Sequence, residues 1–289
     1  MTAADVVGAL DIGGTHVTVG RVQLSSATVA PGTRARLEFT SGMTILGRIL
    51  EAATSVATPQ TRRFGVAAPG PFDYEAGVSL VSHKLPGLYG IDLRSELAAA
   101  VGLDGRHISF LNDAEAFLLG EWWAGAARGH ARALGITLGT GLGSAFLEEG
   151  RFVRSGAGVP ADGALYTLAF RGRPVEETIS RRGLVQRYRA DGGPDVEEIA
   201  SRARAGDGRA QLVFDELGAD LAEFLAAPLT AFAPSCVVVG GSITRAWDLL
   251  SPTLLQRLAA LRPLVVAHAV NIDDAPLLGA AAYAATASS

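Results

Sequence analysis

The chain has 289 residues with 48% hydrophobic and 19% charged side chains, which excludes a disordered protein and allows one large or two modest domains. Its formal net charge of −4 argues against a nucleic-acid partner, whose affinity would depend on Lys and Arg side chains that neutralise phosphates. The single cysteine, Cys236, excludes an intrachain disulfide and any site built from several thiolates.

The first half of the chain reads as strands and helices in alternation. We predict strands over 6–10, 16–22, 63–68 and 108–111, and helices over 44–56 and 92–101. The first two strands form a hairpin, because two β-rich runs flank a turn that contains glycine. Helical spacing of apolar residues such as Ile45 and Ile49 predicts the first helix, and Asp92 is placed as the N-cap of the second.

The second half repeats the opening pattern of strand, glycine-rich turn and strand. LDIGGTHVTVG (10–20) and ITLGTGLGSAFL (136–147) can be laid over one another, which predicts two similar α/β halves facing a cleft. Residues 154–174 read as irregular. We predict strands over 134–137, 236–239 and 264–270, and helices over 114–128, 175–189, 196–205, 210–227, from about 244, and over 275–285.

The two glycine-rich turns are candidate anion sites. Glycine lets backbone N–H groups approach an anion with no Cβ in the way, and Asp11 could orient a water bound to Mg²⁺ beside it. An ordinary tight turn is the alternative for each motif alone, but two turns in matching places favour a two-sided cradle for a phosphate chain. Neither turn is a Walker A loop or a Rossmann fingerprint. The residues concerned are Asp11, Gly13, Gly14 and Thr15, and Gly139, Thr140 and Gly141.

A third glycine motif, Gly240-Gly241, ends a buried strand and precedes a helix. This arrangement suits a nucleotide, because bare backbone and a helix N-terminus can lie under a base or a phosphate. It equally suits a plain turn in which Ser242 or Thr244 serves as the N-cap.

Asp113 follows a strand and begins a helix. It is either an ordinary N-cap or a general base that accepts the proton of a hydroxyl as that hydroxyl attacks a γ-phosphate. Position alone does not separate the two roles, and one residue can serve both. The neighbouring Asn112 could hydrogen-bond the same substrate.

Six motifs occur in order along the chain: ALDIGGTH (9–16), GVAAPGPFD (65–73), LNDAEAFLLGEWW (111–123), ITLGTGLGSAF (136–146), EEIASRARAGDGRA (197–210) and VVVGGSI (237–243). As a set they resemble the ROK family (repressors, open reading frames, sugar kinases). The resemblance implies an α/β protein with the two-lobed, actin-like and ribonuclease H-like ATPase fold of the sugar kinase/Hsp70/actin superfamily. It implies a small lobe over 1–112, completed by a helix at about 274–289, and a large lobe over 113–273 with nucleotide and dimer contacts.

The resemblance also implies roles for single residues. Asp113 aligns with the catalytic base of the family, and Asn112 and Gly70 align with its substrate-binding positions. The two glycine turns align with its phosphate loops, and Gly240 and Gly241 with its adenosine motif. ATP and Mg²⁺ are the implied donor and cofactor.

The chain departs from the family between residues 158 and 180. The family usually has Glu-x-Gly-His followed by a cysteine-rich zinc motif, and neither can be read in GVPADGALYTLAFRGRPVEETIS, so we predict no zinc. Glu176 is similar to the glutamate after the zinc loop, and Asp162 could partly replace the missing one, so both are predicted to bind substrate. His83-Lys84-Leu85 also replaces the usual Asn-Leu. Together these changes predict an unusual acceptor.

We therefore expect a carbohydrate kinase that uses Mg-ATP to phosphorylate a hydroxyl of a hexose, amino sugar or cyclitol, and that forms a homodimer. Two alternatives stay open: a catalytically silent sugar-binding regulator of the same family, and a glucokinase that uses polyphosphate. A DNA-binding repressor is disfavoured, because the first strand starts by Val6 and leaves no room for a helix-turn-helix before it. No apolar run is long enough for a bilayer, so we expect a cytoplasmic protein without a membrane partner.

Overall fold

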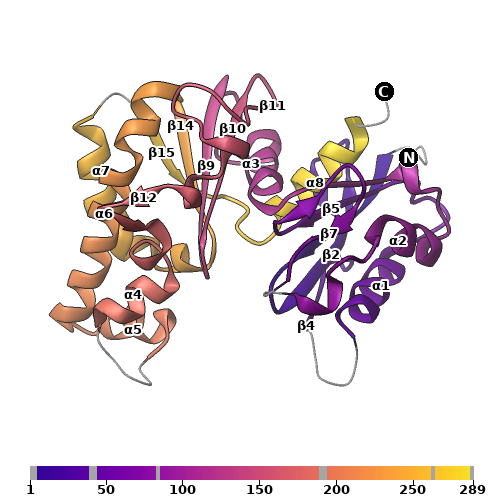
Figure 1. Ribbon diagram of the computed structural model, residues 1–289, viewed down its shortest axis with the longest axis horizontal. Helices are drawn as coiled ribbons and strands as arrows, with labels where there is room; N and C mark the ends of the chain where they lie inside the picture. The colour runs from indigo at the N-terminus through magenta and orange to yellow at the C-terminus, as the bar shows by residue number, and fades with distance from the viewer. Residues whose placement is uncertain (1–4, 39–43, 83–84, 189–193, 262–263, 287–289) are drawn as a thin grey trace. The chain divides into compact units, whose positions relative to one another are not determined.

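The computed structural model describes residues 5–38, 44–82, 85–188, 194–261 and 264–286. The chain divides into two compact units, one over 1–128 with 273–289 and the other over 129–272. Figure 1 shows the helices and strands of both units, and each unit is described by itself below.

The first unit is built on a six-stranded sheet. Its strands are β1 (Val6–Ile12), β2 (His16–Gln23), β3 (Thr28–Val29), β4 (Ala35–Glu38), β5 (Phe64–Ala68) and β8 (Ile108–Asn112). Their order is β3-β2-β1-β5-β8, with β4 also paired to β2. β1 and β2 form the predicted antiparallel hairpin, whereas β5 and β8 run parallel to β1. The carboxyl ends of β1, β5 and β8 therefore meet at one edge of the sheet, where ligands of open α/β sheets commonly bind.

Helices cover this sheet and hold it together. They are α1 (Ile45–Val56), α2 (Leu93–Val101), α3 (Asp113–Ala124) and α8 (Ala275–Thr286), with short 3-10 turns η2 (Pro86–Leu88) and η3 (Gly105–His107) and a small hairpin of β6 (Phe72–Asp73) and β7 (Val78–Ser79). Thr44 caps α1 by accepting a bond from the Gly47 amide, and Asp92 caps α2 as predicted. Figure 1 shows the C-terminal α8 beside strands from the start of the chain.

Glycines allow α8 to pack closely against this unit. A Cβ at Gly279 would lie 1.9 Å from the Ala116 oxygen of α3, and a Cβ at Gly120 would lie 2.0 Å from the Ala275 oxygen of α8. This close packing places α3 in the first unit, so the unit continues to residue 128 and not only to the boundary predicted at 112.

The second unit has a five-stranded sheet of the order β11-β10-β9-β14-β15. Its strands are β9 (Arg132–Leu138), β10 (Leu142–Glu148), β11 (Arg151–Phe152), β14 (Cys236–Gly240) and β15 (Val265–His268). β9 and β10 form an antiparallel hairpin, and β14 runs parallel to β9. This arrangement matches β1, β2 and β5 of the first unit, in agreement with the internal repeat.

The 25-residue α6 is the main helix of the second unit, and its buried Phe214, Leu217 and Leu221 belong to the core. It continues through Pro228 to Phe232, five residues beyond the predicted end. The other helices are α4 (Arg181–Tyr188), α5 (Val196–Arg204) and α7 (Trp247–Ala259), with 3-10 turns η4 (Ala161–Gly163), η5 (Leu165–Thr167), η6 (Val175–Glu177) and η7 (Ser242–Ala246) and a hairpin of β12 (Ala169–Phe170) and β13 (Arg173–Pro174).

The helix predicted over 175–189 is divided into η6 and α4. The division occurs at Ser180, whose hydroxyl donates to the Glu176 oxygen and accepts from the Gly183 amide at 3.2 Å. Such side-chain bonds compete with regular helical bonds, which accounts for the break.

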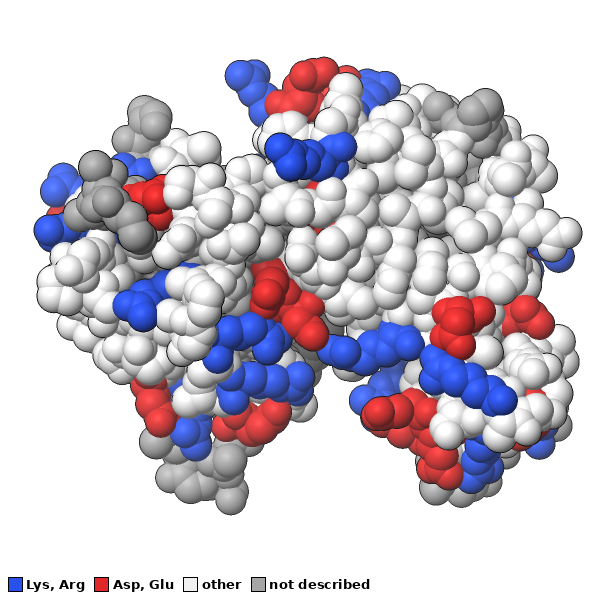
Figure 2. Space-filling view, turned by 180° about the vertical axis from the view of Figure 1, so that it is seen from behind, with Lys and Arg blue, Asp and Glu red and all other residues white. Residues whose placement is uncertain are grey.

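Charged side chains are mixed over the molecular face shown in Figure 2, where acidic and basic groups lie among large uncharged areas. Many belong to ion pairs, such as Arg204 with Asp248 at 2.6 Å. Within the second unit, Asp220 joins Arg171 and Arg187 and so ties the β12–β13 hairpin to α4 and α6. No helix of the described chain is long and apolar enough to cross a membrane.

Candidate functional site

The sheet of the first unit brings the predicted acidic residues to one edge. Asp11 of β1 pairs with Ala67 of β5, and Ala67 pairs with Leu111 of β8. With neighbouring strands about 4.8 Å apart, the ends of β1 and β8 are separated by about 10 Å. Asn112 and Asp113 follow Leu111 directly, so they and Asp11 lie at the same edge.

The structure assigns the N-cap of α3 to Asn112, whose Oδ1 accepts a hydrogen bond from the Ala114 amide at 2.9 Å. The alternative in which Asp113 is the ordinary N-cap is therefore wrong. Asp113 is instead the first helical residue, and its side chain is exposed. Its Oδ1 also accepts from the Ala114 amide at 2.9 Å. The helix N-terminus stabilises a negative charge at this position.

Tyr74 connects two predicted substrate residues, and no pattern in the sequence indicates this role. Its hydroxyl donates to the Ala68 oxygen at 3.1 Å and accepts from Asn112 Nδ2 at 3.1 Å. A Cβ at Gly70 would lie 3.6 Å from the same hydroxyl oxygen. Gly70 and Asn112 thus lie together around Tyr74, which fixes the orientation of the Asn112 amide.

Asp11 has an unusual ionisation. Burial raises its pKa from 3.8 to about 7, with a smaller contribution from the negative charge of Asp113 and an opposing one from Arg36. A divalent cation nearby would favour the ionised form. Mg²⁺ usually binds one or two carboxylates together with waters and phosphate oxygens, so the Asp11 carboxylate fits it as one ligand, directly or through a water. The described residues contain no group of three or more His, Cys, Asp and Glu side chains suited to a complete protein cage.

The turn after β1 offers free backbone donors. The Gly13 amide donates to the His16 oxygen at 2.8 Å, and this bond closes the turn. Within the described chain, no hydrogen bond uses the amides of Gly14 and Thr15, and both residues are exposed. A Cβ at Gly14 would meet nothing within 4 Å, so packing does not demand glycine there. The turn is therefore open to an anion.

The turn after β9 has the same pattern. The Gly139 amide donates to the Gly141 oxygen at 3.0 Å, while the amides of Thr140 and Gly141 make no hydrogen bond to the described residues. Each unit thus presents two neighbouring free amides at matching positions. This pairing is the geometry that a phosphate-binding turn requires.

Gly241 brings the third glycine motif against the second turn. Its φ is +90°, and a Cβ there would lie 2.5 Å from the Leu138 oxygen, so both conformation and packing require glycine. A Cβ at Gly139 would lie 3.4 Å from Ser242 Oγ.

The alternative in which Ser242 or Thr244 is the N-cap is wrong, because Gly241 is the N-cap of η7 and Ala246 that of α7. Thr244 is fully buried and donates from its hydroxyl to the Gly241 oxygen at 2.8 Å, which fixes the glycine motif from inside. His268 Nε2 lies 3.1 Å from the same hydroxyl, and its ring stacks on Trp247. The burial of Thr244 follows from the way η7 packs and has no sequence signal.

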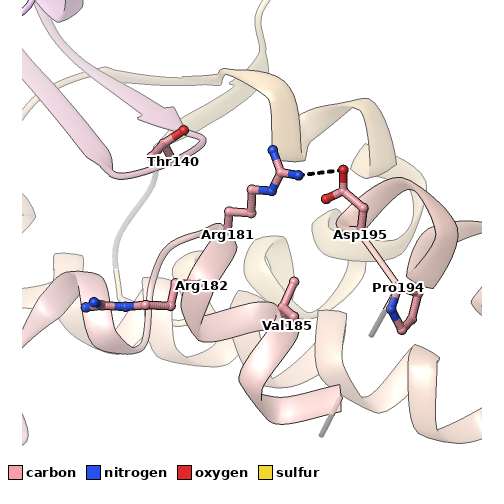
Figure 3. Close-up of a pocket in the computed structure, with 6 residues that line it drawn as sticks. All are labelled: Thr140, Arg181, Arg182, Val185, Pro194 and Asp195. Atoms are coloured by element: carbon pink, nitrogen blue, oxygen red, sulfur yellow. Dashed lines mark hydrogen bonds and ion pairs between the residues drawn. The ribbon is translucent and has the colours of Figure 1, made fainter. Parts of the chain in front are cut away.

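A pocket of about 370 Å³ lies beside the second turn (Figure 3). Val185 and Pro194 provide apolar lining, and Thr140 comes from the turn itself. Arg181 forms an ion pair with Asp195 at 2.6 Å, whereas the exposed Arg182 has no ion pair or hydrogen bond among the described residues. In Figure 3 the two arginine side chains extend in different directions from α4. Neither arginine lies in one of the sequence motifs that predict a site.

The two predicted substrate residues of the second unit differ in their contacts. Glu176 is partly buried and accepts a bond from the Leu142 amide at 2.9 Å, directly after the second turn. Asp162 is exposed, with a left-handed backbone (φ 56°), and makes no hydrogen bond to the described residues. Ser144 holds the following segment by bonding to Gly163 and Leu165. His83 and Lys84 lie outside the described residues.

The chain is similar to known proteins over almost its whole length. The chain is 29% identical to a glucokinase of Thermotoga maritima, over 94% of this chain and 95% of the relative. The solved ROK family glucokinase from Streptomyces griseus, in complex with glucose and AMPPNP, has a TM-score of 0.78 at 24% identity and covers 96% of this chain and 98% of its own. An inorganic polyphosphate/ATP-glucomannokinase from Arthrobacter sp. strain KM has a TM-score of 0.68 at 26% identity, over 97% and 98% of the two chains.

These solved structures confirm the predicted α/β, actin-like ATPase fold. The ROK family pattern matches residues 7–287, which is almost the whole chain. Both glycine turns, the Asn112-Asp113 pair and the Gly240-Gly241 motif lie within the matched range. The chain therefore belongs to the ROK family.

Proposed function

We propose that this chain is a carbohydrate kinase that transfers the γ-phosphoryl group of Mg-ATP to a hydroxyl of a sugar or a sugar-like polyol. The observation that carries the proposal is the pair of matching turns, each with two free backbone amides, together with an exposed aspartate at the start of α3. The kinase names of the relatives support the same class of reaction.

Asp113 is the proposed general base. It accepts the proton of the acceptor hydroxyl as the hydroxyl oxygen forms its bond to the γ-phosphorus and the bond to the leaving β-phosphate oxygen breaks. The helix N-terminus and the Asn112 cap hold the carboxylate in place. Tyr74 in turn orients Asn112, which leaves the second Nδ2 hydrogen for an acceptor hydroxyl.

The glycine turns are the proposed phosphate-binding elements. The amides of Gly14 and Thr15, and those of Thr140 and Gly141, donate to phosphate oxygens and so neutralise charge that grows during transfer. Mg²⁺, when bound with ATP, neutralises the phosphate oxygens, and Asp11 would hold it through a water. The pocket beside Thr140 takes the rest of the nucleotide: Val185 and Pro194 suit a base, and Arg182 suits a phosphate.

The acceptor is proposed to be a hexose, an amino sugar or a cyclitol held by Asn112, Gly70 and Glu176. The lack of Glu-x-Gly-His in residues 158–180 supports an acceptor that differs from glucose in its hydroxyl pattern. Asp162 is exposed and unconstrained, so it can supply one carboxylate to such an acceptor. A homodimer in the cytoplasm remains part of the proposal.

The test is an ADP-release assay with Mg-ATP and a panel of hexoses, N-acetylated hexosamines and cyclitols. The proposal expects at least one acceptor to stimulate ADP release well above the rate with ATP alone. An absence of stimulation across the panel, with protein that binds AMPPNP, would instead support the silent sugar-binding regulator.

Inorganic polyphosphate is a second candidate donor, favoured by Arg182, which has no ion pair among the described residues, beside Thr140. A linear polyanion would bind Arg182 and the turn amides without needing an apolar surface for a base. Rates with equal phosphoryl concentrations of ATP and of polyphosphate decide between them. Acceptor phosphorylation with polyphosphate alone would establish this donor.

A further inference from the structure

The carboxylate of Glu176, a predicted substrate residue, contacts the end of the second glycine turn. Its Oε1 accepts a hydrogen bond at 2.9 Å from the amide of Leu142, the first residue after that turn. Bonds between a carboxylate and a backbone amide are charge-assisted and stronger than those between neutral groups. Glu176 therefore restrains the end of the turn.

A second hydrogen bond runs in the opposite direction between the same two segments. The Arg181 amide donates to the Gly139 oxygen at 2.9 Å, at the start of the turn. The segment of Glu176 is itself fixed by Val175 and Ile179, whose side chains are fully buried. Both ends of the turn are thus attached to the segment 175–181. Within the described chain, only the amides of Thr140 and Gly141 in the middle of the turn are left without a hydrogen bond.

The space around Gly141 also indicates the contact between Glu176 and the turn. A Cβ at this position would lie 2.1 Å from Glu176 Oε1 and 3.1 Å from its Cδ. The nearest atoms within 4 Å all belong to Glu176, and the φ of Gly141 is not in the left-handed region. Glycine is therefore needed at 141 to make room for the carboxylate, and alanine would push it away from the Leu142 amide.

We infer that Glu176 is a positioning residue for the phosphoryl donor: its carboxylate fixes the Gly139–Gly141 turn so that the free amides of Thr140 and Gly141 meet the donor's phosphate oxygens. The inference rests on the proposed function and extends it, because Glu176 then supports the binding of the phosphoryl donor as well as that of the acceptor. Loss of this bond costs donor affinity through the turn, without any contact between Glu176 and the donor.

Three substitutions and one control separate this role of Glu176 from others. Glu176→Gln keeps an oxygen that accepts from the Leu142 amide, whereas Glu176→Ala removes it. Gly141→Ala keeps Glu176 but displaces its carboxylate, so it tests the same contact even where Glu176→Ala does not fold. Glu177→Ala is the matched control, because Glu177 is an exposed neighbour with no hydrogen bond or ion pair among the described residues.

The experiment is calorimetric titration of each full-length variant with Mg-AMPPNP, without acceptor, so that its outcome does not depend on turnover. We expect Glu176→Ala and Gly141→Ala each to weaken binding ~10-fold, which corresponds to one charge-assisted hydrogen bond. The double variant should be no weaker than either single one, and Glu176→Gln should restore affinity to within ~3-fold of the wild type.

Two results would overturn the inference. One is additive loss in the double variant, which would mean that Gly141 serves direct approach of a phosphate and not the placement of Glu176. The other is wild-type affinity in Glu176→Ala, which would limit Glu176 to the acceptor. If no sugar is phosphorylated by a protein that still shows the expected binding pattern, the proposed function fails and the positioning role of Glu176 stands.

Discussion

Asp11 makes the stability of the first unit depend on pH in a direction opposite to that of most aspartates. Its pKa is raised from 3.8 to about 7 in the folded chain, mainly by burial and then by the charge of Asp113. The unfolded chain ionises near 3.8, so ionising Asp11 in the folded chain costs free energy. The contribution of Asp11 to stability is therefore fully present below pH 4 and is lost as the pH rises to about 7.

The size of this loss follows from the shift of about 3 pKa units. At 1.36 kcal/mol per unit the ceiling is about 4 kcal/mol. The Asp11 side chain is only partly buried, and solvent relaxes around it, so we expect roughly 2 kcal/mol in practice. Replacement by asparagine keeps the shape and removes the charge, and hence Asp11→Asn should abolish this loss.

The assay is thermal unfolding of the wild type and of Asp11→Asn between pH 4 and 8, without nucleotide or Mg²⁺. We expect similar Tm values near pH 4, and a difference in favour of Asp11→Asn that grows as the pH rises to about 7 and reaches several degrees, at about 2–4 °C per kcal/mol. Asp162→Asn, at an exposed position, is the control for the removal of one carboxylate. Parallel pH profiles of Tm for the wild type and Asp11→Asn would contradict this prediction.

Three further predictions concern other parts of the site. In chemical denaturation, Gly241→Ala should lower the free energy of unfolding by at least ~2 kcal/mol more than Gly206→Ala. Both glycines have positive φ, but only a Cβ at 241 would collide with a backbone oxygen of β9, so equal losses would contradict the packing argument. Tyr74→Phe should cost ~1 kcal/mol of stability and raise the acceptor KM more than the ATP KM, and an unchanged acceptor KM would remove its role in orienting the substrate amide. Arg182→Ala should raise the KM for the phosphoryl donor ~5–10-fold. Arg62→Ala, the control at an exposed position, should leave this KM unchanged. Equal donor KM values for the two variants would show that Arg182 only faces solvent.

Local patterns in the sequence were sufficient to predict most strands and the two hairpin turns. Glycine-containing turns between β-rich runs indicated β1–β2 and β9–β10, and Asp92 was correctly predicted as the cap of α2. These features depend on residues that are close in the chain, and so their propensities are visible in it.

Features that depend on distant contacts could not be predicted. The contact of Glu176 with Leu142 joins residues 34 positions apart, and it gives Gly141 a structural reason that the motif alone did not suggest. Tyr74 lies 38 positions from Asn112, so no local pattern indicates that the two residues meet. The sequence left open whether Asp113 is the N-cap of α3, and the structure gives that position to Asn112. Both residue types are good N-caps, and only the backbone decides between them.

Asp113 is the proposed general base, and Asp113→Asn removes its charge while the side chain keeps its shape. Once an acceptor has been found, acceptor-stimulated ADP release and AMPPNP affinity are measured for the wild type and the variant. We expect kcat to fall by about 10²–10⁴-fold while AMPPNP binds with an affinity close to that of the wild type. Turnover by Asp113→Asn at the wild-type rate would rule out this role.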